Sequence, residues 1–366
     1  MAMGNYLWLD AVVERHRLPE DPPEMGDAAW FDHLNAFEQQ ETRRQVAFKR
    51  KHWPDLPDGE WSGKAGYFYP HILPAGQEAG NLYPPIAAAL AQYAACKDIV
   101  LHKEYANLRS SQACCFNFLF PFRDALGQAA AALRPLIPAG SGVRAIEFEY
   151  TGPDATTEWL GEPPGGKRGS NRTSSDAAIW WTDPEGCRRL TLVEWKYTER
   201  QFGGCGGFAS KGNRITHKCL RWDRASFDPG KDCYLALGDT PKNSRLYWEH
   251  LSEAGIDLDP YPAGPCPFIG PTYQLMRLHL LAAHLRELGE AEHTEVAVVC
   301  FKGNTDLLGV PPHLSQLGPD MPSAWRRLLR EPESFRIWCA EDLAAAIRDA
   351  GGNESLAAYL KERYGV

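Results

Sequence analysis

Long apolar runs, a basic leader and an overall positive charge are all missing from this sequence of 366 residues. No stretch of about eighteen uninterrupted apolar residues occurs, so the sequence predicts no helix that spans a bilayer. The first residues also lack the basic and then apolar pattern of a secretory leader with a small-residue cleavage site. We therefore expect a cytoplasmic protein.

The net charge of −8 argues against a protein that coats nucleic acid with a surface that is basic throughout. Positive charge is concentrated locally instead, in a basic segment at residues 211–224 that contains a single acidic residue, Asp223. His217 and Trp222 lie between the charges, so the segment could contact phosphates and a base or sugar. A solvated basic loop explains it equally well. Its cations are Lys211, Arg214, Lys218, Arg221 and Arg224.

Ten cysteines are present, but none of them form a CxxC pair. Four surround the basic segment and could hold zinc or an iron–sulfur cluster: Cys205, Cys219, Cys233 and Cys266. Their wide, irregular spacing favours free thiols in a reducing compartment, and we assign no metal to them at this point.

The composition is that of an ordinary globular protein, with 44% hydrophobic and 23% charged residues. A chain of this length can bury a full core without disulfides or metal. We see no internal repeat. We expect a helical and irregular extension over residues 1–105, a core over 106–305 and a helical segment packed on that core over 306–366.

Apolar periodicity and turn residues predict the order of the elements. Helices are predicted over residues 27–50, 85–96, 112–136 with a break at Pro121, 272–288, 341–349 and 355–364. Strands are predicted over residues 143–150, 176–182, 189–197 and 296–301, and the Asp-Pro-Glu-Gly turn at 183–186 makes the middle two a hairpin. In the first strand, Ile146, Phe148 and Tyr150 are expected on one face and Glu147 and Glu149 on the other. The order predicts an α/β layer structure with a mixed sheet.

Charged residues interrupt this hairpin at three positions, Asp176, Glu194 and Lys196. Glu194 and Lys196 are two apart on one strand and share a face, and Asp176 begins the adjacent strand near the level of Glu194. Two such carboxylates can share Mg²⁺, which lowers the pKa of a bound water, while the lysine orients that water or balances charge. A surface salt bridge between Glu194 and Lys196 is the alternative. Charges within an apolar run are costly, however, so the pattern favours a catalytic site.

The stretch SSDAAIWW followed by LTLVEWKYTE resembles the D…ExK signature of the PD-(D/E)XK nuclease superfamily. The phrases HKEYANLRSSQACCFNFLFPF, GSNRTSSDAAI and PTYQLMR resemble a bacterial branch of restriction-endonuclease-like proteins, so the resemblance covers about residues 100–302. It implies an αβββαβ core, metal ligation by Asp176 and Glu194, and a catalytic role for Lys196. It also implies hydrolysis of phosphodiester bonds with Mg²⁺ or in its place Mn²⁺. A DNA endonuclease of a restriction or defence system is our first hypothesis, and the sequence leaves DNA versus RNA and endonuclease versus exonuclease open.

A further acidic ligand usually comes from the first helix of this core or from the strand after it. Residues 112–136 contain no glutamate, so Glu149 is our candidate metal ligand, with Glu147 behind it. Gln274, at the start of the helix over 272–288, could touch the metal-bound water or the scissile phosphate, or could be an ordinary polar residue at a helix start. Gln112 and Asn117 are expected to support the site or simply to form the polar face of the first helix.

Two other functions remain open. One is a nucleic-acid-binding protein that has the nuclease fold without catalysis, which would not need all of Asp176, Glu194 and Lys196. The other is a protein whose cysteines hold a metal or cluster and whose acids are structural. A homodimer would allow double-strand cuts, although the sequence shows no dimerisation signal.

Overall fold

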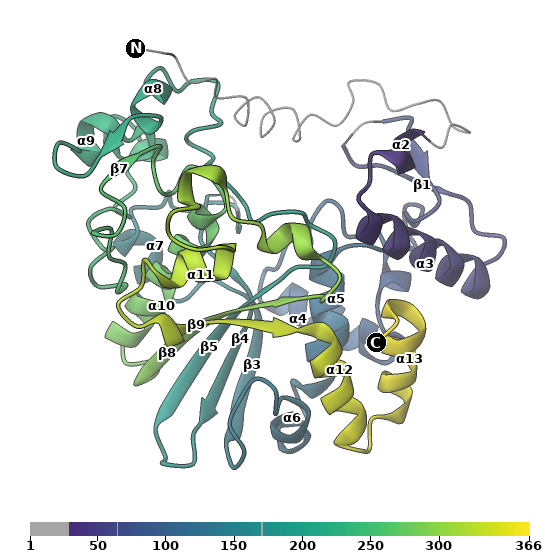
Figure 1. The fold of residues 1–366 in the computed structure, drawn as a ribbon. Helices are drawn as coiled ribbons and strands as arrows, with labels where there is room; N and C mark the ends of the chain where they lie inside the picture. Colours follow the sequence, from purple (N-terminus) through teal and green to yellow (C-terminus); the bar gives the residue numbers. More distant parts are fainter. Residues whose placement is uncertain (1–28, 64, 170) are drawn as a thin grey trace. The chain divides into compact units, whose positions relative to one another are not determined.

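The computed structural model describes residues 29–63, 65–169 and 171–366. The chain forms two compact units (Figure 1). One contains the described residues up to Asn81 together with Leu101–Ser110, and the other contains Leu82–Val100 and Ser111–Val366. No helix in the described part has the length and apolar character needed to cross a membrane.

The first unit contains two helices where the sequence predicted one over 27–50. Helix α2 spans Ala29–Asp32 and α3 spans Ala36–His52; the predicted start at residue 27 lies outside the described residues. A capping box separates the helices, because Asn35 accepts a hydrogen bond from the Glu38 N–H at 2.8 Å and Glu38 accepts one from the Asn35 N–H at 2.9 Å. Strands β1 (Gly59–Glu60) and β2 (Phe68–Tyr69) form a short antiparallel pair.

A five-stranded mixed sheet forms the centre of the second unit, in the order β3-β4-β5-β8-β9. The predicted α/β class with a mixed sheet is therefore confirmed. The strands β3, β4 and β5 are antiparallel neighbours, whereas β5, β8 and β9 run parallel. Their bounds are β3 Gly142–Tyr150, β4 Ser175–Thr182, β5 Arg188–Trp195, β8 His293–Cys300 and β9 Phe335–Cys339.

The predicted hairpin joins β4 to β5. Asp183 stabilises its turn, since one carboxylate oxygen accepts from the Cys187 N–H at 2.8 Å and the other from Arg189 Nε at 2.6 Å. Gly186 adopts a φ of 91°, which favours glycine. Strand β5 is buried from Leu190 to its end, as expected of a strand covered on both faces.

Helices cover both faces of the sheet (Figure 1). On one face, α10 packs against β8 and α7; on the other, α5 packs against β4 and β5, and α6 against β3 and α12. The bounds of the helices are α4 Ala87–Cys96, α5 Ser111–Leu119, α6 Leu126–Ala132, α7 Asp154–Trp159, α8 Thr216–Cys219, α9 Pro229–Asp232, α10 Thr272–Glu287, α11 Met321–Arg326, α12 Ala340–Asp349 and α13 Glu354–Tyr364.

Several expectations for these elements were wrong. Helix α10 is buried on nearly every side, because residues 203–271, which we call the insertion and for which no regular element was predicted, share its core. The insertion, all of which the structure describes, contains only one pair of short strands, β6 (Trp222–Asp223) and β7 (Ala263–Gly264). Helices α7 and α11 and strand β9 fall in stretches for which no helix or strand was predicted.

A buried ion pair connects the loop before β4 to α10 and to the insertion. Glu162 accepts hydrogen bonds from the Thr173 N–H at 2.8 Å and from the Tyr247 hydroxyl at 2.6 Å. The Arg277 guanidinium lies 3.4 Å from the same carboxylate, and both side chains are almost completely buried. The loop that leads to Asp176 is therefore fixed from behind by charge-assisted hydrogen bonds.

Replacing Glu162 with alanine should destabilise the protein strongly. The substitution leaves the Arg277 guanidinium buried without its counter-ion, which costs about 3–5 kcal/mol in the free energy of unfolding. Urea denaturation followed by circular dichroism measures this loss. Glu158→Ala on the exposed side of α7 is the control and should change stability by about 0.5 kcal/mol or less. Equal effects of the two substitutions would contradict the structural role of the pair.

Candidate active site

Three carboxylate residues occupy one row across three neighbouring strands. Ala177 pairs with Val193, so Asp176 on β4 lies level with Glu194 on β5. Phe148 and Tyr150 pair with Ala177 and Ser175, so Glu149 on β3 is level with Asp176. The register of the sheet alone thus brings Glu149, Asp176 and Glu194 to the same height.

Glu194 is the most heavily bonded of the three acids. Its Oε1 atom lies 2.8 Å from Lys196 Nζ and accepts a hydrogen bond from Gln274 Nε2 at 2.6 Å. The Gln274 Oε1 atom in turn accepts from the Gly203 N–H at 2.8 Å. Glu194 is 4% exposed and Lys196 8%, so this is a buried ion pair and not the surface salt bridge that was the alternative.

Asp176 is held against the neighbouring strand, where its Oδ2 atom accepts from the Trp195 N–H at 2.6 Å. Burial raises the pKa of this carboxyl well above its usual value, and the negative charges of Glu194 and Glu149 raise it further. Lys196 and the Trp195 N–H act in the opposite direction but do not compensate. The row therefore holds more negative charge than its own cation balances.

Glu149 has an unusual backbone, with a φ of 49° at a residue that is not glycine. At this residue the regular alternation of side chains between the two faces of the sheet is interrupted. Phe148 packs on Phe116 of α5, whereas Tyr150 packs edge-on against Trp180 in the core that contains α10. The expectation that Tyr150 shares a face with Phe148 was therefore wrong.

The Glu149 carboxylate accepts a hydrogen bond from Gln112 Nε2 at 2.5 Å, at the start of α5. Burial raises the pKa of Glu149, and the nearby Glu194 raises it too, against the lowering effects of Gln112 and Arg168. Glu147, expected behind Glu149, instead pairs with Lys97 at 3.0 Å on the surface.

Lys196 lies just past β5 and stays in the ladder, because its N–H donates to the Val299 carbonyl at 2.8 Å. Its ammonium group lies 5.8 Å from the centre of the Phe202 ring. Burial alone would lower the pKa of Lys196, but Glu194, Glu199 and Asp176 outweigh burial and raise it. The lysine is thus a permanent cation within the acidic row.

Sequence reasoning missed two groups that support this lysine. Glu199 accepts from the Tyr197 N–H at 2.7 Å and contributes to the high pKa of Lys196. Asn304 donates to the carbonyls of Tyr197 and Glu199 at 3.0 and 2.9 Å, which fixes the chain beyond the strand. Glu199 could have been noticed three residues after Lys196, whereas Asn304 follows a distant strand and carried no local signal.

A bound metal must be compatible with these side chains. Among residues 29–63, 65–169 and 171–366, no three or more histidine, cysteine or acidic residues form a group that could hold a metal ion as they stand. Mg²⁺, however, needs only one or two protein carboxylates and keeps several waters. Asp176 and Glu194 meet that requirement. Burial first, and then the charges of Glu194 and Glu149, raise the pKa of Asp176, and a bound cation would oppose both effects.

The basic segment lies in the insertion, where its cations are exposed. Lys218 pairs with Asp232 at 2.9 Å, and Arg224 pairs with Asp259. Within the described part of the chain, Lys211, Arg214 and Arg221 form no ion pair. Trp222 was considered as a base contact, but it is 3% exposed and stacks near Trp248 and Tyr261 in the core. That expectation was wrong.

The family described as "Restriction Endonuclease associating with ARP" matches residues 26–365. The chain belongs to this family. No protein of curated function and no solved structure matches the chain. The predicted resemblance to a restriction-endonuclease-like branch is thereby confirmed. Membership in this family indicates a nuclease with a role in defence, and hence a nucleic-acid substrate.

Replacing Asp176 with asparagine should stabilise the protein at neutral pH. A carboxyl whose folded-state pKa is raised favours folding at low pH, and that stability is lost as the pH rises from the unfolded to the folded pKa. Asparagine retains an acceptor for the Trp195 N–H and does not titrate. In EDTA, the melting temperature of Asp176→Asn should exceed that of the wild type increasingly as the pH rises through the range above about 4, the usual pKa of an aspartate. A constant difference across that range would contradict a raised pKa.

Proposed function

We propose that the chain is a metal-dependent DNA endonuclease with the αβββαβ core of the PD-(D/E)XK superfamily. The elements α5, β3, β4, β5, α10 and β8 would form that core, and β9 extends its sheet. The observation that carries the proposal is the buried contact of Lys196 and Gln274 with Glu194, in the same row as Asp176. The family supports a nuclease that acts in restriction or defence.

Asp176 and Glu194 are the proposed ligands of Mg²⁺, which Mn²⁺ could replace, with Glu149 beside them at the end of β3. When bound, such an ion polarises a phosphoryl oxygen and lowers the pKa of a coordinated water. Gln274 holds the Glu194 carboxylate in place, and the Gly203 N–H holds Gln274. Gln112 orients Glu149 in the same way.

Lys196 is the proposed catalytic cation. Its raised pKa keeps the ammonium group protonated at any pH at which the protein works. A phosphodiester beside Glu194 would meet this fixed positive charge, which stabilises the charge that builds on phosphorus oxygens during hydrolysis. Because Lys196 is 8% exposed, it is preorganised and does not have to be drawn from solvent.

Lys196→Ala should lower the rate of cleavage by about 10²–10³-fold or more, because the positive charge facing the scissile phosphate is removed. Cleavage of plasmid, single-stranded DNA and RNA is measured with Mg²⁺, Mn²⁺ or EDTA. The control is Lys302→Ala, since Lys302 is exposed and pairs with Asp342 instead of with a carboxylate of the row. Cleavage that persists in EDTA or in Lys196→Ala would contradict the proposal. Binding without cleavage in every metal would indicate a catalytically silent nuclease fold.

The basic segment is the proposed site that binds the DNA backbone. Every cation that neutralises a phosphate adds about one to the slope of log K against log salt. The triple substitution of Lys211, Arg214 and Arg221 by alanine should therefore weaken binding and reduce that slope by about three. Fluorescence anisotropy across a salt series measures the slope. Arg348→Ala on α12 is the control, and an unchanged slope in the triple variant would place the DNA elsewhere.

A further inference from the structure

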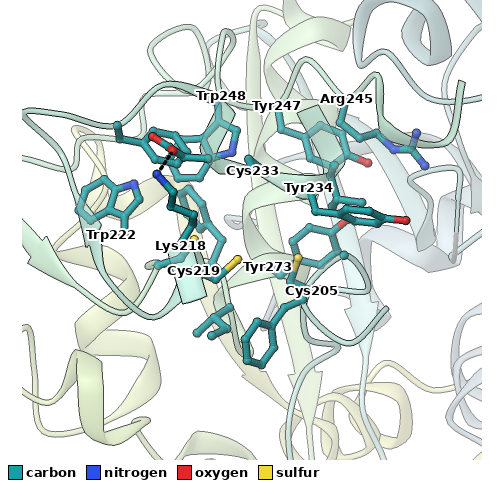
Figure 2. A pocket seen from close by; sticks show the side chains of 18 of the residues that line it. Cys205, Lys218, Cys219, Trp222, Cys233, Tyr234, Arg245, Tyr247, Trp248 and Tyr273 are labelled. Atoms are coloured by element: carbon teal, nitrogen blue, oxygen red, sulfur yellow. Dashed lines mark ion pairs between the residues drawn. The ribbon is translucent and has the colours of Figure 1, made fainter. Parts of the chain in front are cut away.

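A cavity in the insertion brings together four cysteines that are far apart in the sequence. The cavity opens to solvent, and the empty space within its outline, open solvent included, is about 580 Å³. Figure 2 shows Cys205, Cys219 and Cys233 around it. The fourth cysteine of the lining is Cys266. Wide spacing had favoured separate free thiols, yet the folded chain places these four around one space.

The four thiols come from four different turns of the insertion. Cys219 ends α8, Cys233 follows α9, and Cys266 lies just past β7. The Cys266 N–H donates to the Cys219 carbonyl at 2.6 Å, which ties two of the turns directly together.

A cluster of several metal atoms needs thiolates distributed around a space, and the four cysteines are distributed around the lining of this cavity. In the described part of the chain, these cysteines do not form a group that could hold one metal ion, and none is in a disulfide. They surround a space instead of converging on a point. Aromatic side chains complete the lining, among them Phe208, Phe227 and Phe268, and an apolar shell limits the access of solvent to a cluster.

The first part of the insertion has little apolar core of its own. Between Gly203 and Leu246, a stretch that the structure describes in full, Trp222 is the only buried apolar side chain. The regular elements there are four-residue helices, 3₁₀ turns and one strand of two residues. Segments with so little core are commonly held by a metal site whose binding free energy becomes folding free energy.

We propose that Cys205, Cys219, Cys233 and Cys266 bind a four-iron, four-sulfide cluster. Iron–sulfur clusters of this type take four cysteine thiolates as ligands. Each thiol would replace an exchangeable ligand of a preformed cluster, and its proton would leave with the ligand displaced. No redox step is required, because the role of the cluster is to join the four turns.

The cluster would position the basic segment relative to the proposed active site. Cys205 is two residues beyond Gly203, whose N–H holds Gln274, and its own N–H donates to the Ile269 carbonyl at 3.3 Å. The basic segment lies between Cys205 and Cys233. The ion pair of Lys218 with Asp232 borders the same cavity (Figure 2). This site does not depend on nuclease activity, because its ligands are separate from the acidic row.

The full chain should be purified without oxygen and its iron, acid-labile sulfide and zinc measured. We expect about four iron and four sulfide per chain, with the visible absorption of sulfur-to-iron charge transfer. Cys219→Ser and Cys266→Ser should each lose most of the iron. Cys96→Ser and Cys187→Ser, outside the cavity, should retain it. Lys196→Ala should keep full iron even if it loses cleavage, which separates failure of this proposal from failure of the proposed function.

If the serine variants fail to fold, the accessibility of the cysteines to an alkylating reagent tests the proposal in the wild-type protein. With the cluster in place, the four cavity cysteines should be protected together while Cys96 reacts, and chelation of iron should expose all four. About one zinc per chain without sulfide, a colourless metal-free protein, or iron that survives the serine substitutions would each overturn the cluster.

Discussion

The buried ion pair of Glu194 and Lys196, at the end of the central strand, is the constraint on which the rest of the structure depends. Removing two charges from water is costly unless close partners replace the lost hydration. Gln274 and the Gly203 N–H supply those partners for Glu194, and Glu199 adds negative charge near Lys196. The central strand β5, the start of α10 and the loop that contains Gly203 must therefore all be folded before this buried ion pair is stable.

The acidic row costs the fold stability, as expected of the proposed active site. The carboxyls of Asp176 and Glu149 both have raised pKa values, because burial and neighbouring charges oppose their ionisation. A sequence selected only for folding would place apolar residues at such positions. Glu149 adds a left-handed backbone, a costly conformation for a residue other than glycine or asparagine. Strain and like charge thus coincide at the same end of the sheet, which supports a role in binding or chemistry over one in packing.

What the sequence could predict was local. The hairpin followed from the turn at 183–186 and from apolar runs on both sides, and pairing across it placed Asp176 level with Glu194. Strand β9 was missed because it is five residues long and is defined by its parallel neighbour β8, which no local pattern reveals. Tertiary contacts determine the interrupted alternation at Glu149 and the common cavity of the four cysteines. The alternation of apolar residues in the strand and the spacing of the cysteines in the sequence therefore gave wrong expectations. The family match covers the whole site region.

The acidic row and the cysteine cavity are joined by one short stretch of chain. The polypeptide leaves the sheet at Lys196, passes Gly203 and Cys205, forms the insertion, and returns at α10, where Gln274 bonds back to Gly203. This hydrogen bond closes the insertion at its base, so the group that orients Glu194 also fixes where the insertion begins. A change in the order of the insertion would consequently reach the acidic row through two hydrogen bonds in series. The basic segment and the carboxylates are therefore connected both by the covalent chain and through Gln274.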